Sequence, residues 1–298
     1  MWFSALLVLI GSASYGILST FTKMAYSEGF NPAQVVCSQM FFGALTFWCL
    51  SLFRWRQLWA VPLPTLLLLL GGGALSGLTG VFYYQSLKEL PASYAVILLF
   101  QFTWIGLMVD WAWKKRRPGF WRWIALVCIL GGTLLAAGLS GGQAVPYTGI
   151  ILGLLSALSY TLFINFSGHA ALELPTLVRN TWMVTGAFLV SLLIFSPDFL
   201  MDGSILRGMW RWGGAMGLFG MVLPVYLFAK GVPKIGSGLA SLLGSVELPV
   251  VMAASIFFLQ EQVSWTQSVG IVVIVIGIAL SLLDKQPKAF IRTERKTA

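Results

Sequence analysis

The sequence predicts an all-α polytopic membrane protein with ten transmembrane helices, arranged as two inverted five-helix repeats. Three observations predict this fold: the composition, the spacing of the apolar segments and a repeat within the chain. Of the 298 residues, 58% are hydrophobic and only 10% are charged, and the mean hydropathy is +0.85. A soluble domain carries about 25% charged residues and less than half apolar ones, so the composition excludes a soluble protein.

Ten apolar windows bounded by Pro, Gly or charged residues have the length of a membrane span, about 20 residues. They cover roughly residues 2–22, 33–53, 65–87, 92–113, 119–139, 147–167, 176–196, 210–230, 236–258 and 265–284. The first window lacks a preceding basic segment, so we interpret it as a transmembrane helix rather than a cleaved signal peptide. The linkers between windows are short and leave no room for a soluble catalytic domain.

The distribution of Lys and Arg predicts the orientation, because cytoplasmic loops carry an excess of both. With the N-terminus in the cytoplasm, fifteen of the 19 Lys and Arg fall on the cytoplasmic side, and Lys23, Lys88, Arg207 and Arg211 fall on the other. We therefore expect a multi-pass protein of the cell inner membrane or plasma membrane, with both termini in the cytoplasm. The net charge of +9 lies in clusters between apolar runs, so it does not indicate binding to nucleic acid.

A repeat displaced by about 140 to 146 residues relates the two halves of the chain. The matching pairs keep their order: Ser14-Tyr15 with Ser159-Tyr160, Pro32 with Pro175, Gly72-Gly73-Ala74 with Gly213-Gly214-Ala215, and Tyr84 with Tyr226. The predicted units are residues 1–142 and 143–284, followed by a basic tail at 285–298. Each unit holds five helices, an odd number, so the second enters the membrane from the opposite side. Inverted repeats are typical of secondary transporters that bind their solute near the midplane.

Several motifs resemble a known family over residues 1 to about 284. The motifs are Tyr15-Gly16, Lys23, Pro32, the segment 87–93, Ala240-Ser241-Leu242-Leu243, Glu247-Leu248-Pro249-Val250, Glu261, Gln267, Gly270 and Gly277. In these the chain resembles the drug/metabolite transporter superfamily, specifically its ten-helix EamA-type permeases. It departs from them at Gln101-Phe102, where the family often has a proline, and at Asp110-Trp111, where it often has a glutamate.

The resemblance implies a cavity lined by helices one, three, four, six, eight and nine. It also implies export of amino acids or related metabolites by alternating access, with the two halves rocking around the cavity. Aromatic amino acids are favoured because several Tyr and Trp residues lie within the predicted spans, where their rings could stack on an aromatic or cationic solute.

Glu247 is the ionisable residue that the sequence places deepest in the membrane, about eleven residues from either end of the ninth predicted helix. A carboxylate at that depth is costly to keep charged without a paired cation. We expect Glu247 either to bind a cationic group of the substrate or to carry a coupling proton. The alternative is a glutamate that joins helices through hydrogen bonds. Pro249 removes an amide two residues later, which predicts a hinge and leaves the carbonyl of Ser245 without its helical donor.

Other polar and aromatic residues recur on single helix faces within the predicted spans. We expect them to line the cavity, with helix packing as the alternative. The predicted substrate-binding residues are Tyr15, Ser19, Tyr83, Tyr84, Gln101, Trp104, Tyr160, Asn165, Tyr226, Ser241, Ser245 and Glu247.

Two further features have structural interpretations. The pairs Gly73 with Gly77 and Gly213 with Gly217 have the spacing of helix-packing motifs in membranes. Asp110 falls near the end of the fourth predicted helix, where we expect its side chain to reach water.

No cofactor or metal is expected. His169 is the only histidine, and no grouping of Cys, His and Asp has metal-ligand spacing. No phosphate-binding motif indicates ATP, and no set of residues indicates an enzyme. The three cysteines lie within apolar runs, at Cys37, Cys49 and Cys128. Because their number is odd and they lie in these runs, we do not expect a set of disulfides.

The expected partners are a small-molecule substrate and the lipid bilayer, with the protein as a monomer or homodimer. Two alternatives remain open. One is a membrane-embedded lipid-carrier flippase or enzyme, which requires cations at cavity depth. The other is an exporter of cationic drugs or polyamines.

Overall fold

The structure is a computed structural model that describes residues 2–90, 92–114, 118–136, 146–195, 198–259 and 264–283. The predicted boundary at 142 and 143, the predicted tail 285–298 and Glu261 lie outside these ranges. The elements are α1 (Trp2–Ser27), α2 (Pro32–Ser51), η1 (Leu52–Arg54), α3 (Trp55–Trp59), α4 (Leu63–Glu89), α5 (Ala92–Leu99), α6 (Phe102–Lys114), α7 (Phe120–Ala136), α8 (Tyr147–His169), α9 (Thr176–Phe195), α10 (Asp198–Met201), η2 (Ile205–Met209), α11 (Trp210–Gly217), η3 (Leu218–Val222), α12 (Leu223–Ile235), α13 (Ser237–Gly244), α14 (Glu247–Leu259) and α15 (Trp265–Leu283).

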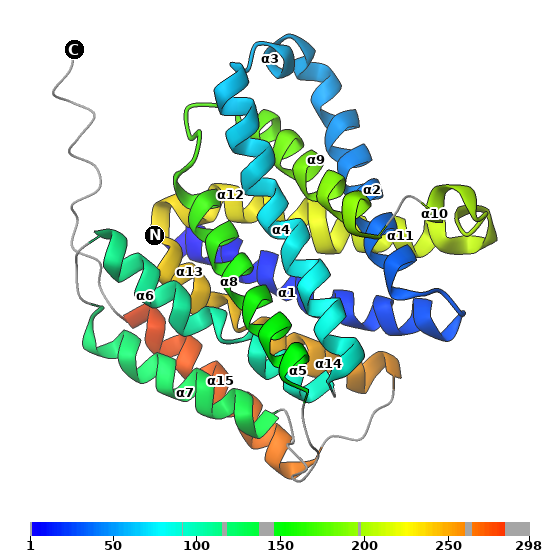
Figure 1. The fold of residues 1–298 in the computed structure, drawn as a ribbon. Coiled ribbons are helices and arrows are strands. Elements are labelled where there is room, and N and C mark those ends of the chain that lie inside the picture. The colour runs from blue at the N-terminus through cyan, green and yellow to red at the C-terminus, as the bar shows by residue number, and fades with distance from the viewer. Residues whose placement is uncertain are drawn as a thin grey trace, which may run out of the picture.

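The predicted fold is confirmed: each of the ten predicted spans is helical, and the described part of the chain contains no strand. Within the described residues, nine of the ten spans are long and apolar enough to cross a membrane, and the fifth, α7, is a shorter apolar helix. The fourth span consists of α5 and α6, the eighth of α11, η3 and α12, and the ninth of α13 and α14. Figure 1 shows this all-helical arrangement.

The fourth and ninth spans are both broken near their middle, at Phe100-Gln101 and at Ser245-Val246. The two breaks lie 145 positions apart in the sequence, which is the displacement of the repeat. At each break the amide of the third-following residue replaces the usual helical donor: Thr103 donates to Phe100 at 3.1 Å and Leu248 to Ser245 at 3.2 Å. Irregular backbone within a membrane is tolerated where it is buried in protein or lines a cavity.

The break in the ninth span corrects the prediction made from Pro249. The Ser245 carbonyl accepts the Leu248 amide, so the expectation of a free acceptor there is wrong. Pro249 is the third residue of α14. Amides in a first helical turn have no partner within their helix, so a proline there costs no hydrogen bond.

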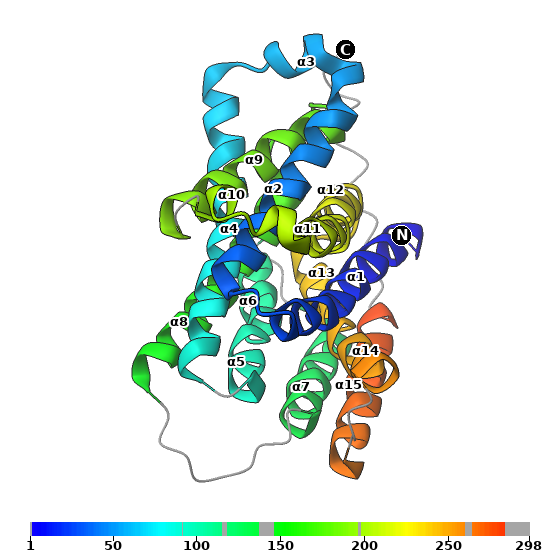
Figure 2. The ribbon, with the colours of Figure 1, turned by 90° about the vertical axis from the view of Figure 1, so that its right-hand side faces the viewer.

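Most helices pack against helices of the other repeat. α1 packs along α12 and α8 along α4, while α2 packs against α11 and α9, and α4 against α9. Figures 1 and 2 both show α7 and α15 side by side at one edge. Exchanging each span for its counterpart in the other repeat therefore reproduces the main contacts.

The predicted glycine motifs lie in these contacts. A Cβ on Gly73 would overlap the carbonyl oxygen of Met183, and one on Gly77 would lie 2.6 Å from that of Ala187. A Cβ on Gly217 would lie 2.9 Å from the amide nitrogen of Gly43. The glycines let α4 approach α9 and α11 approach α2, which confirms the packing interpretation.

The two ends of the helix bundle differ. At one end α6 packs closely against α13, and α8 against α12. The repeat relates α6 to α14 and α13 to α5, yet the described residues of α5 and α14 make no comparable contact, and Figure 2 shows these two helices apart. The bundle is therefore closed at the end where α6, α8 and α13 meet and more open at the other.

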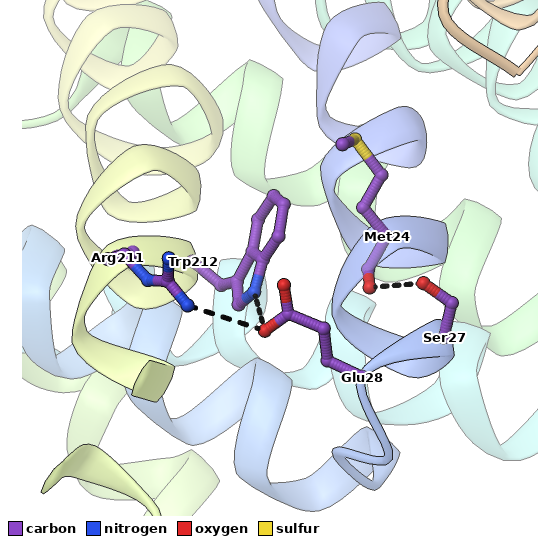
Figure 3. Close-up of polar contacts among 5 residues, drawn as sticks. All are labelled: Met24, Ser27, Glu28, Arg211 and Trp212. Atoms are coloured by element: carbon purple, nitrogen blue, oxygen red, sulfur yellow. Dashed lines mark hydrogen bonds and ion pairs between the residues drawn. The ribbon is translucent and has the colours of Figure 1, made fainter. Parts of the chain in front are cut away.

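At the more open end, a polar cluster joins α1 to α11. Figure 3 shows the indole nitrogen of Trp212 donating to the carboxylate of Glu28 at 2.8 Å, with the guanidinium of Arg211 3.7 Å from the same carboxylate. Because α1 and α12 pack along their length, this cluster holds together one pair of neighbouring helices.

Candidate functional site

Four residues from four different spans meet where the ninth span is broken. Glu247 begins α14, and its carboxylate lies close enough to the hydroxyls of Tyr15, Tyr83 and Tyr160 to interact with them electrostatically. The tyrosines come from α1, α4 and α8. Glu247, Tyr15 and Tyr83 are half-buried.

A close helix contact positions this cluster. A Cβ on Gly16 would lie 2.8 Å from the carbonyl oxygen of Glu247, so α1 touches the start of α14 at this level. Glycine is needed for that approach, and Tyr15 is its neighbour in sequence. The helix break at Ser245-Val246 ends α13 and places Glu247 in the first turn of a new helix, where a negative charge is favoured.

Aromatic rings surround the cluster. The ring of Tyr15 lies edge-on to Tyr160 and to Phe228, each with centroids 6.2 Å apart. The ring of Phe102 lies edge-on to Tyr160 at 4.8 Å, and Phe163 stacks on Tyr160 at 6.4 Å. The rings come from α1, α6, α8 and α12, so the walls of the site are apolar except for the hydroxyls.

Three buried hydroxyls in this region have no hydrogen-bond partner among the described residues: those of Ser12, Tyr160 and Ser245. Their side chains are at most 7% exposed. A buried hydroxyl without a partner costs free energy. These three oxygens have almost no accessible surface, so a ligand or water would reach them only after neighbouring side chains move. Among the described residues no cation is paired with Glu247 either.

Other predicted site residues are engaged elsewhere. The Gln101 carbonyl accepts the Trp104 indole N–H at 2.8 Å, while its amide donates to Ile97 at 2.9 Å, so these side chains bridge the break between α5 and α6. Ser241 is buried against Gly106 and donates to the Ser237 carbonyl at 3.0 Å. Both arrangements correspond to helix packing.

Tyr84 and Tyr226 lie to the sides of the cluster. Tyr84 contacts Tyr83, with ring centroids 5.9 Å apart. The ammonium of Lys230 lies over the ring of Tyr226, 4.4 Å from the ring centroid. Tyr226 also borders an apolar groove of about 380 Å³, whose lining residues are Phe47, Leu50, Leu177, Leu218, Val222, Leu223 and Tyr226. The side chain of Ser19, which belongs to α1, lies outside the described residues.

Asn165 belongs to a second polar group, at the closed end. Its amide donates to the Ser237 hydroxyl at 3.1 Å, and that hydroxyl donates to the Asp110 carboxylate at 3.1 Å. Asp110 is only 6% exposed, so the prediction that it reaches water is wrong. A Cβ on Gly238 would lie 2.8 Å from its carboxylate oxygen, which shows why α13 can cover it.

Sequence reasoning also missed Arg179 as a buried residue. It is 2% exposed, and its guanidinium donates to the carbonyls of Ala170 at 3.1 Å and Ala229 at 2.9 Å. These bonds join the end of α8 to α9 and α12. A lone arginine in the second turn of a span carries no sequence signal for such a role, because its carbonyl partners are distant backbone groups.

Comparison with known proteins agrees with this architecture. The model of the EamA-like transporter family matches residues 2–138 and again residues 147–283. The chain is 24% identical over 202 residues to the uncharacterized transporter YwfM of Bacillus subtilis, covering 66% of each protein. It is 24% identical over 277 residues to the uncharacterized transporter YdfC of the same organism, covering 89% of this chain and 87% of YdfC.

A solved crystal structure has the same fold, with a TM-score of 0.75 at 16% identity, covering 94% of this chain and 97% of that one. The two family matches correspond to the two five-helix repeats of the structure, and together they span nearly all the described helices. The chain is therefore a multi-pass membrane protein that belongs to the EamA-like transporter family.

Proposed function

We propose that this transporter is a secondary exchanger that exports small organic solutes carrying an amino group, by alternating access around Glu247. Amino acids are the leading candidates, aromatic ones first, because tyrosine rings surround the carboxylate. The observation that carries the proposal is a carboxylate without a cationic partner among the described residues, at a helix break where α1, α4, α8 and α14 converge.

The packing supports two moving units that each combine helices of both repeats. α1, α2, α11 and α12 form one unit and α4, α8 and α9 form the other, with α2 packed against α9 where the two units meet. Contacts among α1, α2 and α4 of the first repeat are few by comparison. The proposed rocking motion therefore takes place between these mixed units rather than between the two halves of the sequence, and the repeat exchanges one unit for the other.

The charge distribution supports an outward-facing conformation. With both termini in the cytoplasm, the end closed by α6, α8 and α13 is the cytoplasmic one, and the central site opens to the other side. Bringing α5 and α14 together, as α6 and α13 are now, would close the outside and complete the cycle.

Glu247 gives such a cycle a means of coupling. A buried carboxylate is stabilised by a proton or by a paired cation, so a proton and the substrate's ammonium group would compete for it. Entry of the proton from outside would release the substrate there, and proton release inside would prepare the site for the next substrate.

The test is counterflow in proteoliposomes with a panel of amino acids, amines, polyamines and nucleobases. For the solute that exchanges fastest, E247Q is expected to lower the rate roughly tenfold or more, since the substrate's ammonium loses a buried ionic partner. The exchange of the variant is also expected to lose its dependence on pH.

Glu28 provides a matched control, because its carboxylate lies on the surface beside Arg211. E28Q makes the same chemical change there and is expected to keep the rate within roughly twofold, as for a surface ion pair. An E247Q protein with the parent rate and the parent pH dependence would contradict the assigned role of Glu247. A folded protein that exchanges no solute would overturn the proposed function.

A further inference from the structure

The central site contains acceptors suited to one ammonium group. An ammonium has three N–H donors and no acceptor. The Glu247 carboxylate can accept from it, and the Tyr160 hydroxyl lies close enough to that carboxylate to interact with it. The Ser245 hydroxyl comes two positions earlier in the same span, and neither hydroxyl has a partner among the described residues. The ring of Tyr15, which lies edge-on to Tyr160, adds an aromatic wall of the kind that attracts organic cations.

The same site offers no cation to a substrate carboxylate. No described Lys or Arg acts on Glu247. The two terminal nitrogens of the Arg179 guanidinium donate to the carbonyls of Ala170 and Ala229 at the closed end. Lys230 is an exposed residue that lies over the ring of Tyr226.

The starts of the helices that follow the two breaks do not supply an anion site either. Amides at a helix start can bind an anion, and the breaks create two such starts, in α6 and in α14. The first turn of α14 already contains the negative charge of Glu247. The start of α6 is covered, because Phe100, Phe102 and Thr103 are at most 2% exposed.

We infer that the site selects organic monoamines whose acid group is absent or masked, in preference to free amino acids. This inference rests on the proposed function, an exporter of solutes that carry an amino group, and within that class it ranks simple amines and amino-acid amides above the free amino acids named first there. On occlusion, the carboxylate of an amino acid would lose its water beside Glu247, without a counter-charge among the described residues. A polyamine would carry further ammonium groups for which the described site holds no second carboxylate.

The test compares four compounds that share one aromatic body. Phenethylamine lacks the acid group, phenylalaninamide masks it, phenylalanine retains it, and N-acetylphenylalanine retains the acid but has no ammonium. Binding to the full chain in nanodiscs is measured at pH 7 by isothermal titration calorimetry. The two amines are expected to bind roughly tenfold or more tightly than phenylalanine, a difference of about 1.4 kcal/mol, and N-acetylphenylalanine is expected not to bind.

E247Q provides the second measurement. In this variant the affinity for phenethylamine is expected to fall to that for phenylalanine, while E28Q keeps the preference of the parent. The inference is overturned if phenylalanine or N-acetylphenylalanine binds as tightly as the amines, or if neither amine binds. The proposed function would survive that result if counterflow still exchanged a zwitterionic solute, and it fails separately if no solute exchanges.

Discussion

The hydroxyl of Tyr160 has an unusual position in this protein. It is buried in the middle of α8, beside the rings of Tyr15 and Phe102, and has no hydrogen-bond partner among the described residues. A residue kept only for packing would be as useful without its hydroxyl, because phenylalanine fills nearly the same volume. The hydroxyl is better explained by a ligand that it contacts during transport.

Replacing Tyr160 with Phe tests this explanation. Y160F is expected to leave the melting temperature unchanged or slightly raised, because no protein hydrogen bond is lost. Its affinity for phenethylamine is expected to fall by roughly threefold to tenfold, the value of one hydrogen bond of about 0.5–1.5 kcal/mol. Thermal denaturation and calorimetry measure the two quantities.

Tyr147 is the matched control, because its side chain is 84% exposed at the start of α8. Y147F is expected to change neither quantity. A marked loss of stability in Y160F, with unchanged affinity, would mean that the hydroxyl has a structural role instead.

Depth and helical spacing selected Tyr15, Tyr83 and Tyr160, whose hydroxyls lie near the Glu247 carboxylate in the structure, and their role in binding stays a prediction. They could not distinguish these from Gln101 and Ser241, whose polar groups are used within or between neighbouring helices. The difference depends on where a helix breaks and which helix faces it, and neither follows from spacing along one span. Asp110 was misplaced for the same reason, since Gly238 on a distant helix covers it.

At the level of helices, glycines determine how closely the two repeats approach each other. Gly73 and Gly77 face α9, while Gly71, two residues earlier on α4, has open space around it. All three lie in one span, so alanine substitutions at these positions would differ mainly in the atoms that the new Cβ contacts. The spacing of Gly73 and Gly77, which Gly213 and Gly217 share on α11, made their packing role predictable.

This contrast gives a paired prediction for stability. G73A is expected to lower the melting temperature clearly, because its Cβ would overlap the carbonyl of Met183 on α9. G71A is expected to be neutral or stabilising by up to about 1 kcal/mol, the difference in helix propensity between Gly and Ala.

Thermal denaturation of the two variants in one detergent provides the measurement, and retention of the monodisperse peak in size-exclusion chromatography checks the fold. Equal melting temperatures for G73A and G71A would show that α4 and α9 can separate at little cost, contrary to the close contact described above.

The positions of the helix breaks could not be predicted from sequence. Pro249 indicated irregularity in the ninth span, but the break precedes it at Ser245-Val246, and the matching break at Phe100-Gln101 has no proline beside it. Ser245 is the residue four positions before Pro249, whose missing amide removes its helical donor, whereas the break at Phe100-Gln101 has no such local cause and is set by packing between spans.

In the whole molecule, the state of the transporter depends on how α6, α8 and α13 meet at the closed end. The Ser237 hydroxyl accepts from Asn165 on α8 and donates to Asp110 on α6. These bonds link three spans near one membrane face. At the more open end, the described parts of α5 and α14 do not pack together.

S237A is expected to shift the protein toward the inward-facing state. Two hydrogen bonds of about 0.5–1.5 kcal/mol each correspond to a shift of roughly tenfold in the equilibrium. A cysteine at half-exposed Val246, with Cys37, Cys49 and Cys128 replaced, reports access to the site. Its labelling by an impermeant maleimide in inside-out vesicles is expected to accelerate in S237A.

Ser281 is the matched control, since its buried hydroxyl donates only within α15, to Ile278 at 2.7 Å. S281A is expected to label at the parent rate. If S237A also labels at the parent rate, the polar group at the closed end does not hold α6, α8 and α13 together.

The exchange of partners between repeats also has a consequence for biosynthesis. α1, α2 and α4 are synthesised long before α8, α9, α11 and α12, the helices against which they pack. Until the second five spans are inserted, the first five therefore lie in the bilayer with their glycine-lined and polar faces uncovered. During that interval the nascent chain depends on lipid or on membrane chaperones to keep those faces from pairing wrongly.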